Sequence, residues 1–247
     1  MSQLPIPQVL LRCRSLRVGY QGRSLLPPID LDLRQGQFWA VVGRNGSGKS
    51  TWFRTVLGLQ RPVAGRTEIL RPETRLAYVA QRIRFDDLYP VDAYDVVAMG
   101  RMRGSRSVLP RFTGEREAVW AALEAVGAQD VAHHNFRALS EGYKQRILLA
   151  RMVASEADLA FLDEPTAAMD AVAEREAMAL IHDLKERFQM AVVVVSHHLE
   201  VAKRYADQVL FLDPDAPAVV AGTPREVFTH PAFQVRYTGV ELEITDA

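Results

Sequence analysis

A glycine-rich stretch near the N-terminal end of the chain has the composition of a phosphate-binding loop. Residues 43–51 fit the pattern G-x-x-x-x-G-K-[ST]. Glycines let the backbone turn tightly and aim N–H groups at phosphate oxygens, and a following helix adds partial positive charge. Lys49 would then reach the β and γ phosphates of a nucleotide, and the Ser50 hydroxyl would bind Mg²⁺. The predicted nucleotide-binding residues are Gly43, Arg44, Asn45, Gly46, Ser47, Gly48, Lys49, Ser50 and Thr51.

Two adjacent acids, Asp163 and Glu164, follow the apolar run 159–162. Burying carboxylates at the end of a strand is costly unless a cation compensates. A Mg²⁺ ion held jointly by Ser50, Asp163 and nucleotide phosphates would supply that compensation. Glu164 would then orient or deprotonate an attacking water. An exposed turn with two solvated acids is the alternative, which the phosphate loop earlier in the chain disfavours.

The elements that must position these residues alternate between strands and helices. Short apolar runs predict buried strands at 38–42, 76–80, 159–162, 191–195 and 209–212. Helical spacing of apolar residues predicts helices at 49–59, 115–126, 172–188 and 198–206. This alternation predicts an α/β fold with a mostly parallel sheet. The phosphate loop therefore stands between a buried strand and a helix, as its chemistry requires.

We expect one domain over residues 1–247. Its α/β nucleotide-binding core covers about 1–91 and 156–215, beginning with a strand at 9–18. A helical block at about 92–155 is inserted into this core. A less regular C-terminal tail, punctuated by prolines, covers about 216–247.

Composition excludes several classes of protein. The 30 basic and 30 acidic residues give a formal net charge of zero, which argues against a nucleic-acid partner. No apolar run is long enough to span a bilayer, and the N-terminus lacks the pattern of a signal peptide. The single cysteine, Cys13, suits a reducing compartment. We therefore expect a folded protein of the cytosol.

A third motif lies just upstream of the two acids. Residues 138–147 have the sequence Ala-Leu-Ser-Glu-Gly-Tyr-Lys-Gln-Arg-Ile, which resembles the L-S-G-G-Q signature of ABC transporter ATPases. The resemblance extends from about Tyr20 to Asp213, with every family element in its expected order. It implies a P-loop NTPase core with an N-terminal antiparallel β part and an inserted helical subdomain that carries the signature.

The resemblance also implies roles for four residues that are weak signals alone. Tyr20 stands where the family has its adenine-stacking aromatic residue. Gln81 matches the Q-loop glutamine, which senses Mg²⁺ or water. Asp170 lies in the D-loop. His197 matches the switch histidine that contacts the γ-phosphate, and we prefer this role to metal binding by the adjacent histidine pair.

The signature departs from the family pattern at two positions. Glu141 replaces a glycine and Tyr143 replaces the glutamine, whereas Ser140 and Gly142 are kept. Ser140 would cap the following helix, whose N-terminus offers positive potential to a phosphate. A carboxylate at position 141 would repel a triphosphate unless it points away. The resemblance therefore implies ATP hydrolysis with an altered signature.

By resemblance, two copies of the chain sandwich two ATP molecules, each between the phosphate loop of one copy and Ser140 and Gly142 of the other. Closure completes the site in which Glu164 acts on water. The implied partners are a second ATPase copy, integral membrane permease subunits and a substrate-binding protein. The chain would then be peripheral at the cytoplasmic face of the inner membrane, reaching the membrane only through the permease.

The transported solute is predicted by analogy alone. Residues 88–101 and 221–228 are similar to the corresponding segments of metal-ion and metal-chelate importer ATPases. Zinc or manganese import is the first choice, and iron–siderophore or cobalamin-type import is the second. An ABC ATPase outside transport, a regulatory subunit with weak hydrolysis, and a P-loop kinase or GTPase are the remaining alternatives.

Overall fold

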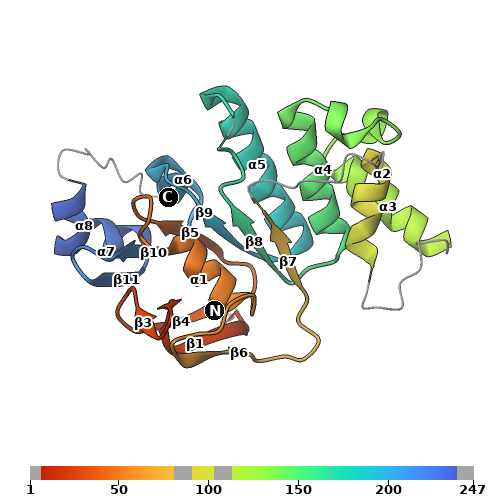
Figure 1. Ribbon diagram of the computed structural model, residues 1–247. Coiled ribbons are helices and arrows are strands. Elements are labelled where there is room, and N and C mark those ends of the chain that lie inside the picture. Colours follow the sequence, from red (N-terminus) through yellow and green to blue (C-terminus); the bar gives the residue numbers. More distant parts are fainter. Residues whose placement is uncertain (1–6, 81–90, 103–112, 168, 238–247) are drawn as a thin grey trace, which may run out of the picture. The chain divides into compact units, whose positions relative to one another are not determined.

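The computed structural model describes residues 7–80, 91–102, 113–167 and 169–237. The chain forms two compact units, one from Met1–Thr74 and Ala191–Ala247 and the other from Arg75–Met190. They are called the first unit and the second unit, and each is described by itself. Figure 1 labels the helices and strands of both.

A mostly parallel sheet forms the centre of the first unit. Its strands lie in the order β11-β10-β5-β9, where β5 runs parallel to both neighbours and β11 pairs antiparallel with β10. The bounds are β5 Phe38–Val42, β9 Ala191–Val195, β10 Gln208–Asp213 and β11 Ala218–Gly222. Every residue of β5 and β9 is buried. This burial on both faces explains why the strands are continuous apolar runs in the sequence.

An antiparallel sheet forms the N-terminal part of the first unit, as predicted. Its strand order is β4-β1-β6, beside a small hairpin of β2 and β3. The bounds are β1 Val9–Arg17, β2 Gly19–Tyr20, β3 Arg23–Ser24, β4 Ile29–Arg34 and β6 Ala64–Ile69. The hairpin places Tyr20 at its tip, where the ring can remain exposed.

Four helices complete the described part of the first unit. They are α1 Lys49–Val56, α6 Leu199–Tyr205, α7 Pro224–Thr229 and α8 Pro231–Arg236. Helix α1 buries Trp52 and Phe53 and ends three residues before the predicted limit at Leu59. Gly58, with φ of 72°, turns the chain away there. The helix is therefore short, and its first turn follows directly on the phosphate loop.

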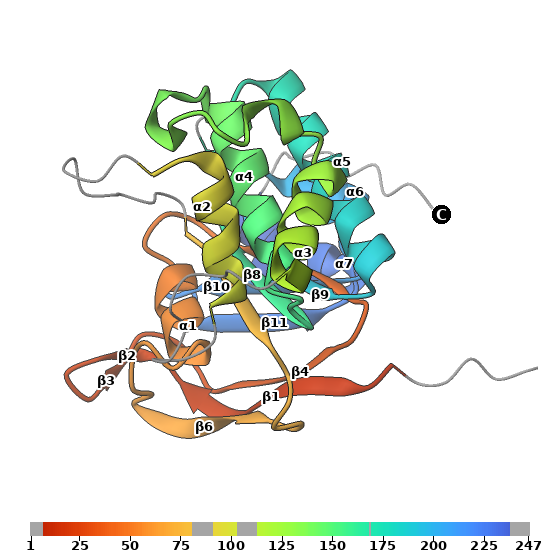
Figure 2. The ribbon, with the colours of Figure 1, turned by 90° about the vertical axis from the view of Figure 1, so that its right-hand side faces the viewer.

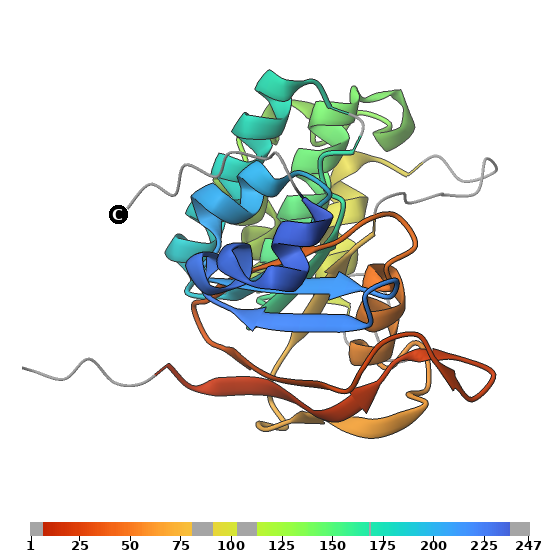
Figure 3. The same cartoon turned by 90° about the vertical axis from the view of Figure 1, so that its left-hand side faces the viewer.

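The C-terminal segment is more regular than the sequence suggested. Helices α7 and α8 lie beside β10 and β11 (Figure 3). Thr223 and Glu226 form a capping box with Pro224 in the first turn of α7, so the proline starts this helix and does not interrupt it. Phe228 and Phe233 are fully buried against the sheet. The prolines therefore punctuate short regular elements.

The described residues of the second unit form two parallel strands and a group of helices. The strands are β7 Leu76–Val79 and β8 Leu159–Asp163. The helices are α2 Ala93–Ala98, α3 Thr113–Ala125, α4 Glu141–Ala154 and α5 Ala171–Phe188, with short 3₁₀ turns η1 Met99–Arg101, η3 Gln129–Val131 and η4 Phe136–Ala138. Helices α2, α3 and α4 pack against one another (Figure 2). The predicted α/β class with an inserted helical block is confirmed.

Candidate functional site

The phosphate loop leaves the carboxyl end of β5 and enters α1 in the first unit. Gly43, Gly46 and Gly48 have positive φ angles of 152°, 83° and 93°. A Cβ atom on Gly43 would overlap the carbonyl oxygen of Leu212 in the neighbouring strand, so both its backbone angle and its surroundings require glycine. The first turn of α1 leaves backbone N–H groups without intrahelical acceptors. These groups are the donors that a phosphate at a helix N-terminus accepts from.

Lys49 is tied to the loop that precedes it. Its ammonium donates to the carbonyl oxygens of Gly43 at 2.6 Å and Arg44 at 2.8 Å. The residue is only 5% exposed, and burying a charged amine requires such polar compensation. The lysine therefore brings positive charge to the loop and orders its backbone at the same time.

The remaining loop residues divide between exposed and buried positions. Arg44, Asn45, Gly46 and Ser50 are exposed, so the Ser50 hydroxyl is accessible to a cation. Ser47 is 2% exposed, and its hydroxyl has no hydrogen-bond partner within the described part of the chain. An unsatisfied buried hydroxyl is uncommon in folded proteins. Ser47 is thus a second polar group of the loop that a bound phosphate could satisfy.

Tyr20 is held beside the start of α1. Its phenol oxygen lies 3.0 Å from the Thr51 hydroxyl oxygen, and the residue is 50% exposed. Gln60 donates to the carbonyl oxygen of Gly19 at 2.6 Å, which fixes the hairpin from the other end of the helix. The structure therefore brings Tyr20 to the phosphate loop with an exposed ring. Its role as the adenine platform stays a prediction.

His197 reaches the same edge of the sheet as the phosphate loop. Val41 in β5 pairs with Val195 in β9, and the two strands are parallel. Gly43 lies two residues after Val41, and His197 lies two residues after Val195. Both residues therefore lie just beyond the carboxyl edge of the sheet. The rings of His197 and His198 lie 4.0 Å apart between centroids, and His198 is the N-cap of α6. The β5–β9 register thus brings together two motifs that are far apart in the sequence.

The two acids lie in the second unit at the carboxyl end of β8. Asp163 is the last residue of the strand and accepts a long hydrogen bond of 3.4 Å from the Tyr78 phenol in β7. Glu164 has a left-handed backbone with φ of 46°, which is uncommon for a residue other than glycine. Both side chains are half-buried. A buried strand that ends in acids is confirmed, and the chemical roles of these acids stay predictions.

Asp170 begins α5 in the same unit. One of its carboxylate oxygens accepts from the backbone N–H groups of Val172 and Ala173, both at 2.9 Å. The Ala173 and Val172 N–H groups hold the pKa of Asp170 below its usual value. Asp170 is therefore the N-cap of α5, a role that the sequence analysis did not predict. Gln81 lies outside the described residues.

The signature begins helix α4. The Ser140 hydroxyl accepts from the backbone N–H of Tyr143 at 3.4 Å, a long capping bond. A Cβ atom on Gly142 would meet nothing within 4 Å, so open space lies beside it. The predicted cap is confirmed, and the start of α4 is exposed at Ser140 and Gly142.

These motifs have the order found in a large family of nucleotide-binding proteins. Residues 26–167 match the family model described as ABC transporter. The manganese transport system ATP-binding protein MntB of Bacillus subtilis strain 168 is 37% identical over 231 residues, which cover 91% of each chain. The chain belongs to the ABC transporter family. The predicted nucleotide of this ABC ATPase is therefore ATP, and the family is one of ATP-hydrolysing subunits.

Two further comparisons extend over most of the ABC ATPase. The zinc import ATP-binding protein ZnuC of Pseudomonas entomophila strain L48 is 34% identical over 224 residues, covering 91% of this chain and 82% of the relative. A solved structure assigned to the metal-chelate type of ABC transporter, in an inward-facing conformation, has a TM-score of 0.82 at 29% identity. The match covers 92% of this chain and 88% of that one. The likeness thus includes both the sequence and the fold.

In the described part of this ABC ATPase, no helix has both the length and the apolar character needed to cross a bilayer. The same residues contain no cluster of three or more His, Cys, Asp or Glu side chains suited to a metal ion. Hydroxyl and carboxylate oxygens, as at Ser50 and Asp163, are nevertheless the donors that Mg²⁺ prefers when nucleotide phosphates supply further oxygens. The donor chemistry therefore fits the predicted Mg²⁺.

The sequence reasoning missed one buried ion pair of the ABC ATPase. Asp213 ends β10 next to the phosphate loop and is 4% exposed. Arg236 in α8 donates to its two oxygens at 2.6 and 2.8 Å. The Arg236 guanidinium holds the pKa of Asp213 below its usual value. An apolar strand ending in an acid is the same signal that marked Asp163, but here a second side chain compensates the carboxylate.

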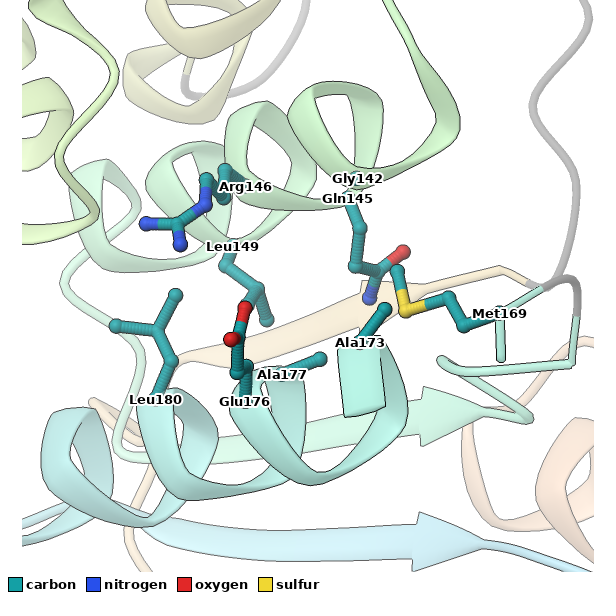
Figure 4. Close-up of a pocket in the computed structure, with 9 residues that line it drawn as sticks. All are labelled: Gly142, Gln145, Arg146, Leu149, Met169, Ala173, Glu176, Ala177 and Leu180. Carbon is teal, nitrogen blue, oxygen red and sulfur yellow. The ribbon is translucent and has the colours of Figure 1, made fainter. Parts of the chain in front are cut away.

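A hollow of about 60 Å³ beside the signature helix was also missed (Figure 4). It lies between α4 and α5, where Gly142, Ala173 and Ala177 leave space. The amide nitrogen of Gln145 is buried there without a hydrogen-bond partner among the described residues, and its side chain points toward Met169 in Figure 4. A cavity of this size with a free donor accommodates ordered water. A lone glutamine in a helix carries no sequence signal for such a cavity.

Proposed function

We propose that this chain is the ATP-hydrolysing subunit of an ABC importer for zinc or manganese. The observation that carries the proposal is the similarity to the manganese transport protein MntB and the zinc import protein ZnuC, each over 91% of this chain. Residues 88–101 and 221–228, which resemble segments of metal-importer ATPases, support the same solute class. The proposed solute contacts other chains of the transporter, since an ATPase subunit supplies energy and not solute specificity.

Nucleotide binding in this proposal begins with the phosphate loop. Backbone N–H groups from Gly43 to Thr51 donate to phosphate oxygens, and the Lys49 ammonium exchanges its loop carbonyls for the β and γ phosphates. The Tyr20 ring stacks on adenine. Mg²⁺ neutralises developing phosphate charge when bound, and Ser50, Gln81 and Asp163 would hold it.

Hydrolysis needs an oriented water and a stabilised γ-phosphate. Glu164 accepts a proton from the attacking water as general base. His197 contacts the γ-phosphate from the sheet edge that it shares with the phosphate loop. These groups act mainly by position and charge, which is the main requirement of phosphoryl transfer.

The complete site requires a second copy of the chain. Ser140, Gly142 and Asp170 of one copy face the nucleotide on the phosphate loop of the other. The proposed further partners are integral permease subunits and a substrate-binding protein. The chain would be peripheral at the cytoplasmic face of the inner membrane, held there by the permease.

Metal uptake by cells tests this function directly. The gene is deleted and replaced with the wild type, with Glu164→Gln or with Lys203→Met as a control outside the site. We expect radiolabelled zinc or manganese uptake to be lost in the deletion strain and with Glu164→Gln, and kept with Lys203→Met. Unchanged uptake of both metals in the deletion strain, with alternative metal importers also removed, would contradict metal import.

Import of a metal chelate is the second candidate. The structural likeness to a transporter of the metal-chelate type, at 29% identity, favours it. The same strains, given iron–siderophore or cobalamin, separate the two candidates. Loss of chelate uptake with retained zinc and manganese uptake would select the chelate importer. Normal uptake of every solute would favour an ABC ATPase that works outside transport.

A further inference from the structure

The first turn of α4 carries a negative charge where the proposed function requires an anion to bind. Glu141 is the first residue of the helix, and its side chain is 64% exposed. A carboxylate in the first turn stabilises the helix itself, because it faces the positive end of the helix dipole. The same carboxylate opposes a second anion at that place. The departure at position 141 therefore favours the helix and disfavours the phosphate.

Lys144 compensates this charge one helical turn later. Its ammonium lies 2.8 Å from a Glu141 carboxylate oxygen, and its side chain is 26% exposed. The positive end of a helix is equivalent to about half an elementary charge. With Glu141 alone the sum at the start of α4 would be about −0.5, and Lys144 returns it to about +0.5. The sign of the local charge thus depends on this lysine, one of four in the chain.

The second departure of the signature, Tyr143, bonds to another element of the same unit. The Tyr143 phenol donates to a carboxylate oxygen of Asp130 at 3.0 Å. This anchors Tyr143 to the η3 turn. Ser140 and Gly142 consequently remain the exposed, uncharged residues of the first turn.

We propose that Lys144 is a positioning residue of the signature, which pairs with Glu141 and so lets Ser140 and Gly142 receive the γ-phosphate held by a second copy. This inference rests on the proposed function, because it requires the two-copy ATP site. An ordinary surface ion pair would stabilise α4 without any effect on ATP. The two interpretations differ in whether breaking the pair changes the ATP requirement of dimerisation.

Dimerisation in ATP measures that requirement. Glu164→Gln serves as the parent, since blocked hydrolysis should leave ATP locked between two copies. The dimer fraction is followed by analytical ultracentrifugation as ATP is added at low ionic strength. Lys144→Met in this parent should raise the ATP concentration at half-maximal dimerisation by roughly two- to fivefold, the range of charge effects at a helix end. The difference should shrink at about 0.5 M salt, because salt screens exposed charges.

Three further variants identify the cause. Lys144→Arg should keep the parent midpoint, and Lys144→Met combined with Glu141→Gly should restore it. Lys203→Met is the matched control, because Lys203 pairs with Glu200 on α6 at the same three-residue spacing and the same 2.8 Å distance. It should leave the midpoint unchanged. Binding of ADP to the monomer should be equal in all variants, since the phosphate loop is intact.

Each outcome decides between stated alternatives. A parent that dimerises while Lys144→Met has the same midpoint refutes the role of Lys144 and leaves the proposed function intact. A shift that persists in the Glu141→Gly background refutes charge compensation. A Glu164→Gln parent that stays monomeric in saturating ATP refutes the two-copy site in the isolated chain, and with it the role of Lys144.

Discussion

Replacing Tyr20 with alanine should weaken ADP binding by about five- to thirtyfold. The phenol bond of 3.0 Å to Thr51 orients the ring beside the phosphate loop, and the residue is 50% exposed. Stacking of a base on an aromatic side chain contributes about 1–3 kcal/mol. Because half of the tyrosine surface is already covered by protein, we expect the lower part of that range, about 1–2 kcal/mol.

The phenol bond itself contributes less. Tyr20→Phe keeps the ring and should weaken binding by about two- to threefold, near the lower limit of a net hydrogen-bond contribution. Thr51→Val removes the same bond from the other side and should have a similar effect. The double variant should be no weaker than either single one, because both changes remove one interaction.

Isothermal titration calorimetry with ADP measures these affinities without hydrolysis. Inorganic tripolyphosphate is the control ligand, since it has phosphates and no base. Tyr20→Ala should leave tripolyphosphate affinity unchanged. An equal loss for both ligands would show that the substitution disturbs the phosphate loop, and an unchanged ADP affinity would refute stacking on Tyr20.

Three further perturbations follow from the first unit. Gly43→Ala should lower the free energy of unfolding by at least about 1 kcal/mol and abolish ADP binding in calorimetry, because φ of 152° and a neighbouring carbonyl leave no room for a Cβ. Arg236→Met should lower the free energy of unfolding by about 2–3 kcal/mol in urea titrations, since it leaves the Asp213 carboxylate buried without its cation. The control Arg66→Met breaks an exposed ion pair and should lower the free energy of unfolding by less than about 0.5 kcal/mol. The pKa of Asp213 is lowered in the folded state, so its contribution to stability is fully present above the unfolded pKa of about 4 and is lost as pH falls through the folded value. The free energies of unfolding of Arg236→Met and Arg66→Met should therefore become equal in acid. Cys13 is buried, and burial raises its pKa to about 12, so a thiol reagent at neutral pH should label it only after unfolding.

Local patterns were sufficient for the parts of the site that are contiguous in the chain. The strand–loop–helix arrangement around Lys49 and the strand that ends in Asp163 were both predicted, because each is written in fewer than about twenty consecutive residues whose burial and turn chemistry are local. Elements that depend on distant partners were missed. Strand β6 is largely exposed and has no alternating pattern, and it exists because its backbone pairs with β1.

The altered signature contains one contact that local spacing suggests and one that it does not. The three-residue spacing of Glu141 and Lys144 is compatible with a helical ion pair. The sequence did not predict the contact of Tyr143 with Asp130, because the two residues belong to different elements. Similarly, an acid at the end of β10 has the same local pattern as Asp163, and only the position of α8 shows that Arg236 neutralises it.

The sequence by itself determined the family, and it predicted the nucleotide class and the phosphate-binding and acidic residues, because these depend on residue types at short spacings. The tertiary structure decided which of these residues meet. His197 reaches the edge of the phosphate loop because β9 pairs in parallel with β5, and Tyr20 faces that loop because its phenol reaches Thr51. It also decided that Arg236 meets the carboxylate of Asp213 and that Tyr143 meets that of Asp130. Such contacts arise from strand register and side-chain packing between distant segments, which no local pattern encodes.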